Sequence, residues 1–488
     1  MKKTIVCASV VFLTSLIVAC TTSHDTRNLP ISQSNSSVEN QQNIVLIVVD
    51  DLRPVLGAYG DENAVTPNID ALALSGVTFN HAYANVPVCG ASRASFLTGL
   101  RPTKDRFIDY KTLAEEDAPG AKSLPQTLRE FGYSTMAIGK IFHNSGDLAE
   151  VSWSEGVHTS GMPHTTSLSL NDFNHAHENQ YTSAKTSGIP WYEIADVDDE
   201  AYPDGKVKQK ALQALTSLAA KQQPFFLSVG FIRPHLPFYA PKQYYELHPP
   251  EKFTPFFHRT KPSNSPALLR GSGEIKTYSF GDYSYNSDEF HTASQRGYYA
   301  SVSYIDALVG DVVDQLEALG MREKTTIILV SDHGFHLGEH NFWTKHTLLK
   351  TALRVPLIIS GPAVAKNEKT NALIELIDIF PTVMDLAKIP QPNNIDGESF
   401  LDVIKNPTLA HKQQIYSRFK EGDSVITEEL IFTSYLSGNS KNEEMLFDLS
   451  TDPHETVNKV ALPEYQNQRA KLKVMLRDCT ESRQCITN

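Results

Sequence analysis

Apolar runs rich in β-branched residues alternate along the chain with amphipathic segments, and this alternation restricts the possible folds more than any other feature. The first run, Asn43 to Val49, is Asn-Ile-Val-Leu-Ile-Val-Val, a composition typical of a strand buried on both faces. Similar runs lie at Ser134 to Ile138, Phe225 to Val229, Thr325 to Val330 and Pro356 to Ile359. Amphipathic segments lie between them, for example at Ile69 to Leu74, Leu124 to Phe131, Val207 to Ala219 and Ala300 to Leu319. We therefore predict an α/β fold with a mostly parallel central sheet flanked by helices.

Polar pairs follow two of these runs directly. Asp50-Asp51 follows the first run, and Asp332-His333 follows the run at Thr325 to Val330 after Ser331. Because ligands of such sheets bind beyond the carboxyl ends of the strands, we expect the two pairs to converge on one edge. Two adjacent carboxylates in a cleft repel each other unless a cation neutralises them, so the pattern predicts a divalent metal site. A helix cap or a turn is the structural alternative for an isolated Asp-Asp.

The N-terminal segment has the features of an export signal. Lys2 and Lys3 precede an apolar run from Ile5 to Ala19 that is too short to span a membrane. The sequence Leu16-Ile17-Val18-Ala19-Cys20 resembles a bacterial lipobox, which predicts lipidation at Cys20; cleavage at small residues without lipidation is the alternative. Residues 21–42, rich in Ser, Asn, Thr and Gln, predict a flexible tether. We expect a periplasmic or outer-membrane lipoprotein of a Gram-negative bacterium that meets the membrane only through this anchor.

Two cysteines lie near the C-terminus, Cys479 and Cys485. In an exported protein, such a close pair predicts a small disulfide. Short strand-like runs from Gln414 to Arg418 and from Leu430 to Tyr435 follow Pro407. We therefore place the start of a smaller C-terminal α+β subdomain at residue 407.

The run Cys89-Gly90-Ala91-Ser92-Arg93, followed by Ala94 to Gly99, points to chemistry. A buried, inert thiol is the ordinary interpretation of a lone cysteine. The run, however, resembles the C-x-[PA]-x-R signature of the type I sulfatases, which belong to the alkaline phosphatase superfamily. Ala91 stands where the family usually has proline. The resemblance implies that a formylglycine-generating maturase oxidises Cys89, so that a hydrated aldehyde is the nucleophile.

Further motifs extend the resemblance along most of the chain. They are Thr66-Pro67-Asn68-Ile69-Asp70, Leu97-Thr98-Gly99-Leu100-Arg101-Pro102, Gly139-Lys140-Ile141-Phe142-His143, Arg233-Pro234-His235-Leu236-Pro237-Phe238, Ser331-Asp332-His333-Gly334, Leu337-Gly338-Glu339-His340, Trp343-Thr344-Lys345, Arg354-Val355-Pro356-Leu357, Asp378-Ile379-Phe380-Pro381-Thr382, Leu446-Phe447-Asp448-Leu449 and Asp452-Pro453-His454-Glu455. The resemblance implies a catalytic sulfatase domain at 43–406, between the signal peptide with its tether (1–20 and 21–42) and the subdomain at 407–488.

The resemblance also assigns roles to residues. It implies that one divalent ion, expected to be Ca²⁺, is held by Asp50, Asp51, Asp332, His333 and the oxidised side chain of Cys89. Histidine is a softer donor than calcium prefers, and many sulfatases have Asn at that position. The implied catalytic residues are Arg93, which positions the nucleophile; Lys140 and Lys345, which bind sulfate; His143, the base; and His235, the acid that protonates the leaving oxygen.

Three functions fit these observations. The first is a sulfatase that acts on glycosaminoglycan or algal polysaccharide fragments, with a maturase as its second partner and no nucleic-acid partner. The second is a phosphate or phosphonate ester hydrolase of the same superfamily, and the third is a non-catalytic surface lipoprotein that binds sulfated glycans. Alkaline-phosphatase-type relatives generally need two metals and a Ser or Thr nucleophile, and a pure binder would not need both His143 and His235.

The net charge of the chain does not identify the sugar of the substrate. The net charge of -12 is a property of the whole surface, and a locally basic cleft can still attract a polyanion. Lys104, Arg106 and Arg233 are candidates for such a cleft, with surface solvation as the alternative for each, and the arginines would suit the carboxylate of a uronic acid. Long insertions at Leu148 to Asp204 and Pro249 to Glu289 lie where loops set specificity in such folds.

Overall fold

The structure is a computed structural model that describes residues 41–154, 157–158, 190–221, 223–436, 443–481 and 485. The predicted signal peptide, Cys20 and nearly all of the predicted tether lie outside the described residues. Among the helices of the described part, none combines the length and the apolar character needed to cross a bilayer.

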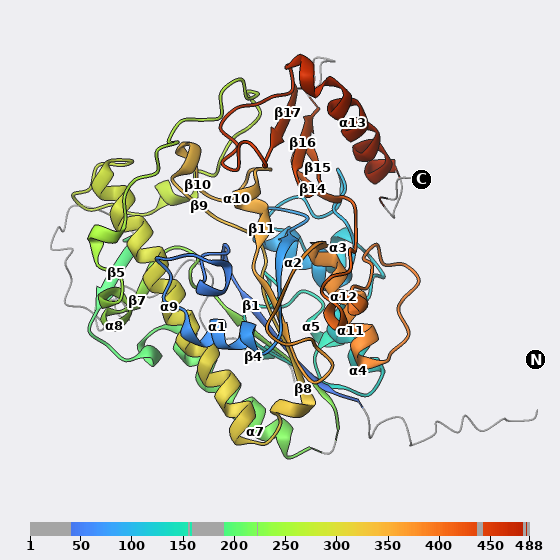
Figure 1. The fold of residues 1–488 in the computed structure, drawn as a ribbon. Helices are drawn as coiled ribbons and strands as arrows, with labels where there is room; N and C mark the ends of the chain where they lie inside the picture. The colour runs from blue at the N-terminus through green and yellow to red at the C-terminus, as the bar shows by residue number, and fades with distance from the viewer. Residues whose placement is uncertain are drawn as a thin grey trace, which may run out of the picture. The chain divides into compact units, whose positions relative to one another are not determined.

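A nine-stranded sheet forms the centre of the described chain (Figure 1). Its parallel core has the order β8 (Thr325–Ser331), β1 (Asn43–Val49), β6 (Phe225–Phe231), β3 (Ser134–Gly139) and β4 (Val157–His158). Beyond β8, the strand β12 (Leu357–Ser360) runs antiparallel and leads to β2 (Val77–Tyr83), which also pairs with β11 (Arg354–Val355) and β13 (Glu368–Glu375). The predicted mostly parallel sheet is confirmed.

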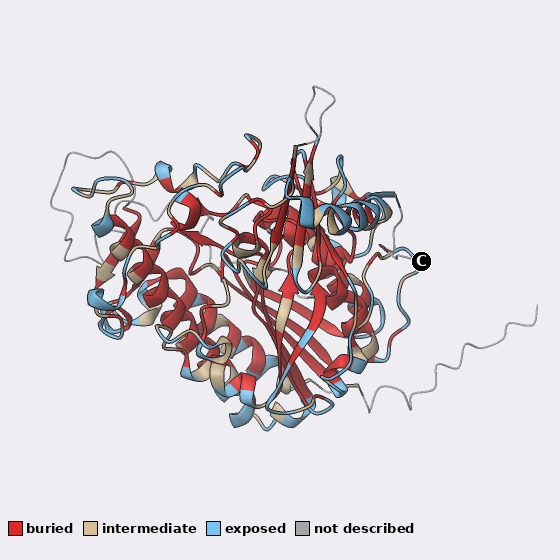
Figure 2. Ribbon diagram, turned by 45° about the horizontal axis from the view of Figure 1, so that its top comes forward, coloured by how far each residue is buried: buried red, intermediate tan, exposed pale blue. Residues whose placement is uncertain are grey.

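Burial on both faces explains why β1 is apolar at nearly every position. Alternate β1 residues pack into two different hydrophobic clusters, one on each side of the sheet. Helices α1 (Pro67–Leu74), α7 (Pro203–Ala219) and α9 (Asp288–Ala318) cover one face, and α2 (Cys89–Thr98), α4 (Leu124–Glu130) and α11 (Ile379–Ala387) cover the other. The sheet is accordingly buried throughout its centre (Figure 2).

Shorter elements connect these layers. They are η2 (Gly57–Tyr59), α3 (Ala114–Asp117), α5 (Ala149–Ser152), β5 (Tyr192–Ala195), η3 (Asp199–Ala201), β7 (Phe238–Pro241), α8 (Lys242–Glu246), η4 (Pro250–Lys252), η5 (Glu274–Thr277), η6 (Arg322–Lys324), β9 (His336–Leu337), η7 (Glu339–Asn341), β10 (Trp343–Thr344), α10 (Lys350–Leu353), η8 (Leu376–Asp378), α12 (Leu401–Lys405) and η9 (Pro463–Tyr465).

A four-stranded antiparallel sheet follows α12. It consists of β14 (Ile415–Phe419), β15 (Gly422–Ile426), β16 (Leu430–Tyr435) and β17 (Glu443–Asp448), and α13 (Gln466–Glu481) packs against it. The predicted disulfide between Cys479 and Cys485 is present. The predicted C-terminal sheet is therefore confirmed, while residues 40–488 form one compact unit.

Sequence patterning placed the start of one helix too late and missed several strands, among them β2 and β13 of the central sheet. Helix α9 begins at Asp288 rather than Ala300, because Ser287 caps it and the buried ring of Phe290 starts its apolar face. The strands β2 and β13 alternate apolar and polar residues only in part, so a search for continuous apolar runs does not find them.

Candidate active site

The ends of β1 and β8 place the two polar pairs side by side. These strands are parallel neighbours with Val49 opposite Ser331, so the residues that follow each strand meet at one edge. Asp50, Asp51, Asp332 and His333 are all fully buried there. The predicted convergence of the two pairs is confirmed.

Backbone contacts fix the orientation of the first pair. Asp51 has a φ of 61°, a left-handed conformation that Asp tolerates better than most residues. The hydroxyl of Tyr298 donates to the Asp51 carbonyl at 2.6 Å, and the amide of Asp51 donates to Asp332 Oδ1 at 3.2 Å. The two adjacent carboxylates therefore point in different directions from one strand end.

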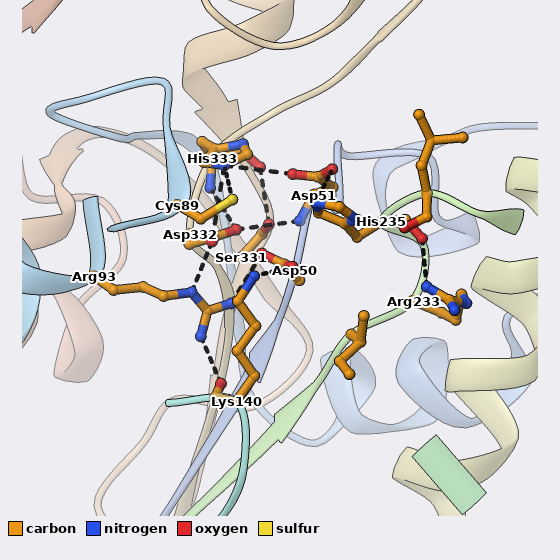
Figure 3. A network of polar contacts seen from close by, with 12 residues as sticks. Asp50, Asp51, Cys89, Arg93, Lys140, Arg233, His235, Ser331, Asp332 and His333 are labelled. Atoms are coloured by element: carbon orange, nitrogen blue, oxygen red, sulfur yellow. Dashed lines mark hydrogen bonds and ion pairs between the residues drawn. The ribbon is translucent and has the colours of Figure 1, made fainter. Parts of the chain in front are cut away.

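Cys89 is the first residue of α2, and its thiol points into this group (Figure 3). Its Sγ lies 3.2 Å from His333 Nε2. The hydroxyl of Ser92 donates to the Asp332 carbonyl at 2.5 Å and so ties α2 to β8. Gly90 is required because a Cβ at this position would lie 2.3 Å from the Tyr110 carbonyl oxygen.

The donor atoms of this group fit one divalent cation. Ligand atoms of Asp50, Cys89, Asp332 and His333 all lie within 4.8 Å of one another. Asp51 Oδ1 is buried and accepts no hydrogen bond from the described residues, which leaves it available as a ligand. Nδ1 of His333 lies 2.9 Å from the Gly334 carbonyl, an arrangement that leaves Nε2 facing the group, as in metal-binding histidines. Carboxylate oxygens are the donors that calcium prefers.

Three cationic side chains surround the carboxylates. Nε of Arg93 donates to Asp332 at 2.8 Å and its NH2 group donates to Asp50 at 3.1 Å. Lys140 donates to Asp50 Oδ2 at 2.5 Å, and Lys345 donates to Asp51 Oδ2 at 3.0 Å. All three side chains are at most 4% exposed, so their charges act in a site from which water is largely excluded.

Burial and charge together shift the pKa values of the site. Burial raises the pKa of Asp51 to about 7, against the opposing effects of Lys345 and His235. Burial alone would lower the pKa of His333, but Asp332 and Cys89 raise it to about 10. These shifts describe the groups without a cation; a bound metal would require both groups to be deprotonated.

The Cys89 thiol responds to the same surroundings. Burial and Asp50 act to raise its pKa, but Lys140, Lys345 and His333 hold the pKa well below its ordinary value. The surroundings of Cys89 thus favour a negative charge on the side chain at position 89.

His235 faces the site from the loop after β6. Its Nδ1 lies 2.6 Å from the Leu236 carbonyl, and its Nε2 lies 3.8 Å from Asp51 Oδ2. Arg233 donates to the His235 carbonyl at 2.7 Å and therefore supports this loop from behind (Figure 3). Burial and Lys345 both act to lower the pKa of His235. Asp51 and Glu274 act in the opposite direction and raise the pKa well above its ordinary value.

His143 lies in the segment that follows Lys140 after β3. It is half-buried, and its ring contacts the Tyr110 ring edge-on with a centroid distance of 6.2 Å. The backbone of Tyr110 in turn packs against Gly90. His143 is therefore placed near the start of α2, and its predicted role as a base stays a prediction.

Sequence reasoning missed two residues of the site. Glu274, in the insertion at Pro249 to Glu289, lies 3.1 Å from His235 Nε2 and 3.0 Å from Lys345 Nζ. Tyr298 belongs to the part of α9 that patterning did not include. Neither position has a signal in the sequence, because both approach the site through tertiary packing alone.

Two of the three residues predicted to form a basic cleft for the sulfated sugar lie elsewhere. Lys104 is 79% exposed and pairs with Asp105, and Arg106 pairs with Asp396 at 3.3 Å. Both line a surface hollow with Arg418 and Lys473. Of the three candidates, Arg233 alone is brought to the catalytic loop.

Comparison with known proteins agrees with this geometry. The family model described as Sulfatase matches residues 42–389, and a model described as N-sulphoglucosamine sulphohydrolase, C-terminal, matches residues 338–482. Mouse iduronate 2-sulfatase is 33% identical over 408 residues, which cover 76% of this chain and 72% of that protein. The motifs from Val88 to Pro102, Gly139 to His143, Pro234 to Phe238 and Ser331 to His340 resemble the same sulfatase.

Solved structures share the fold at lower identity. Phosphonate monoester hydrolase of Agrobacterium radiobacter has a TM-score of 0.74 at 20% identity, over 90% of this chain and 96% of that chain. A protein solved in complex with its substrate D-glucosamine-2-N,6-O-disulfate has a TM-score of 0.70 at 19% identity, over 90% of this chain and 98% of that chain.

The fold and the buried centre of carboxylates, imidazole and thiol define a hydrolase with an alkaline phosphatase-like architecture. Within that class, the family match covers most of the chain. The chain belongs to the sulfatase family, and it is a sulfatase enzyme.

Proposed function

We propose that this sulfatase removes O-sulfate from a sulfated carbohydrate, a fragment of a glycosaminoglycan or an algal polysaccharide, with Cys89 oxidised to formylglycine. One observation carries the proposal. The thiol of Cys89, at the start of α2, lies with Asp50, Asp332 and His333 within 4.8 Å. Sulfated sugars appear in the names of the similar proteins, as iduronate sulfate and as glucosamine disulfate.

Two groups that this chain would have to acquire supply the central chemistry. A divalent ion, expected to be Ca²⁺ and held by Asp50, Asp51, Asp332 and His333, would polarise a sulfate oxygen. The hydrated aldehyde at position 89 would supply one hydroxyl for attack at sulfur and a second for releasing the sulfate.

The chain's own side chains bind and orient the substrate. Lys140 and Lys345, both buried, provide fixed donors for the non-reacting sulfate oxygens, which carry the charge of the transition state. Arg93 holds Asp50 and Asp332 in place and lies beside position 89. His235 presents Nε2 toward the site and donates the proton to the leaving sugar oxygen. His143 is the base for clearing the sulfated intermediate, and it would accept the proton of the second hydroxyl as sulfate is expelled.

Export completes the proposal. Lipidation at Cys20 would hold the enzyme in the periplasm or at the outer membrane of a Gram-negative bacterium, where it meets exogenous sulfated glycans. A formylglycine-generating maturase would act on Cys89 as a partner of the unfolded chain.

Sulfate release from a panel of defined sulfated disaccharides tests the function. The protein is produced together with a maturase, and intact mass reports the state of Cys89. We expect release from at least one disaccharide, dependent on added Ca²⁺. Hydrolysis of phosphate or phosphonate monoesters without sulfate release would favour the alternative hydrolase, and binding without release would favour a sulfated-glycan-binding lipoprotein.

A further inference from the structure

The carboxylate of Glu274 bridges two cationic side chains of the proposed active site. Its Oε1 lies 3.1 Å from His235 Nε2, and its Oε2 lies 3.0 Å from Lys345 Nζ. In the proposed function these nitrogens serve the leaving oxygen and a sulfate oxygen. The two carboxylate oxygens of Glu274 therefore contact the same two nitrogens that the sulfate ester would contact during the reaction.

Glu274 lies at the entrance of the site. Its side chain is 22% exposed, whereas His235 and Lys345 are 3% exposed and Asp51 is fully buried. The backbone beside it is anchored, because Ile275 is fully buried and η5 packs against β10. A rotation of the Glu274 side chain toward solvent would free His235 and Lys345. The negative charge of Glu274 would then remain beside the entrance.

The two cations that Glu274 contacts, His235 and Lys345, are the ones that the ester needs, and the three other basic candidates make different contacts. Lys104 and Arg106 pair with acids in another hollow. Arg233 donates to the His235 carbonyl and lies over the Tyr239 ring, 5.4 Å from its centroid. A second anionic group on the sugar, close to the ester, would therefore approach Glu274 and be disfavoured by like-charge repulsion.

We propose that Glu274 determines which sulfate esters the site accepts: its carboxylate, bridging His235 and Lys345 at the entrance, favours esters of neutral or amino sugars over esters whose sugar carries a neighbouring carboxylate. The inference rests on the proposed function and narrows its substrate class. Mouse iduronate 2-sulfatase, by its name, acts on an iduronate ester, so the preference inferred for this chain differs from the substrate of that relative.

A pair of substrates that differ by one carboxylate tests the inference. Nitrophenyl sulfate and its ortho-carboxylated analogue are hydrolysed by the wild type and by Glu274→Gln, and the ratio of their kcat/KM values is compared. Comparing the ratio between proteins cancels the intrinsic reactivities of the two esters. We expect Glu274→Gln to shift the ratio about tenfold toward the carboxylated ester, which corresponds to about 1.4 kcal/mol.

Asp282→Asn is the matched control, since it removes one exposed negative charge from the same insertion. We expect it to keep the wild-type ratio, and Glu274→Ala to shift the ratio in the same direction as Gln. A wild-type ratio in both Glu274 variants overturns the inference while leaving the proposed function intact.

Binding of non-hydrolysable sulfonates separates the two proposals. Lack of turnover by matured wild-type protein on either ester, and on the disaccharide panel, contradicts the proposed function alone. Calorimetric titration with benzenesulfonate and ortho-sulfobenzoate then measures the same discrimination without catalysis. A tighter relative affinity for ortho-sulfobenzoate in Glu274→Gln supports the role of Glu274, and equal relative affinities, or no binding by any of the proteins, overturn it.

Discussion

Among the buried charges of the described residues, two clusters differ in how their carboxylates are hydrogen-bonded. The Asp51 cluster is the candidate active site, where Asp50, Asp51 and Asp332 meet Arg93, Lys140 and Lys345. The Glu375 cluster, at the end of β13, pairs Glu375 and Asp378 with Arg101 and Lys412. Both clusters are almost completely buried, so burial of charge does not distinguish a reactive site from a structural one.

Hydrogen bonding does distinguish them. Every carboxylate oxygen of Glu375 and Asp378 accepts a bond, and backbone amides of Tyr416 and Glu398 contribute at 3.1 and 2.8 Å. Burial acts to raise the pKa of Glu375, yet Arg101 and Lys412 lower it overall. In the Asp51 cluster, by contrast, Asp51 Oδ1 accepts no bond from the described residues and burial raises its pKa to about 7. A buried carboxylate oxygen that accepts no hydrogen bond is costly unless a ligand compensates for it.

The largest expected effect is on Cys89. Cys89→Ala should reduce sulfate release by about 10³-fold or more, because it removes the nucleophile. The free energy of unfolding should change by at most about 2 kcal/mol, since the side chain is small. Steady-state kinetics and urea unfolding measure the two effects. Wild-type turnover by the variant would remove the formylglycine mechanism.

The second-largest expected effect is on the affinity for Ca²⁺, which should depend on the Asp51 cluster and not on the Glu375 cluster. Asp51→Asn should weaken Ca²⁺ binding by about 100-fold or more, as expected for loss of a ligand when outer-shell changes already cost 10- to 100-fold. Isothermal titration of the chelator-treated protein measures the affinity. Glu375→Gln is the control and should bind Ca²⁺ as the wild type does; equal affinities in wild type and Asp51→Asn would exclude Asp51 as a ligand.

The free energy of unfolding should depend on the Glu375 cluster, in contrast to Ca²⁺ affinity. Glu375→Gln should lower the free energy of unfolding by about 3–5 kcal/mol, because it leaves Arg101 and Lys412 buried with one carboxylate fewer. Turnover per folded molecule should stay at the wild-type level, since Glu375 lies outside the active site. Urea unfolding followed by circular dichroism tests this prediction, and a loss below 1 kcal/mol would show that the Glu375 cluster has no structural role.

Glu455 sharpens the comparison, because it resembles Asp51 without belonging to a site. Its Oε1 accepts no bond from the described residues, its Oε2 accepts the Lys350 amide at 2.9 Å, and burial raises its pKa to about 7 against the opposing effect of Lys350. The folded protein thus holds this proton more tightly than the unfolded chain, whose pKa is near 4.5. The contribution to stability is complete below pH 4.5 and is lost as the pH rises to about 7.

Glu455→Gln should therefore remove a pH dependence of at most about 3 kcal/mol between these limits. Urea unfolding of both proteins at several pH values measures it. Between pH 4.5 and pH 8, the wild type should lose more of its free energy of unfolding than the variant does. Parallel stability curves for the two proteins would show that Glu455 titrates normally.

The sequence predicted the centre of the fold because that part depends on local pattern. The strands β1, β3, β6 and β8 are buried on both faces, so their apolar composition identifies them, and the polar residues at their ends follow from chain direction. The strands β2 and β13 were missed because polar residues interrupt their apolar pattern. The start of α9 was missed for a related reason, since its first half packs aromatic side chains rather than an apolar stripe.

The candidate site divides in the same way. Asp50, Asp51, Cys89, Asp332 and His333 lie within motifs and could be named from the sequence, and the structure brings them together. Glu274 lies in an insertion without periodicity, and its contact with His235 spans 39 positions along the chain. The residues predicted to form a basic cleft were selected by charge and by closeness in the sequence to catalytic motifs, and two of them pair with acids in another hollow.

The sequence by itself determined the family, the alternation of strand and helix, and the set of candidate ligands, because these are carried by short runs whose meaning does not depend on the rest of the chain. Tertiary structure alone decided which carboxylates keep an unbonded oxygen, which cations are already paired, and which acid stands at the entrance. Those properties depend on distances of a few ångströms between segments far apart in sequence, and hydrogen bonding and charge interaction are determined at that scale.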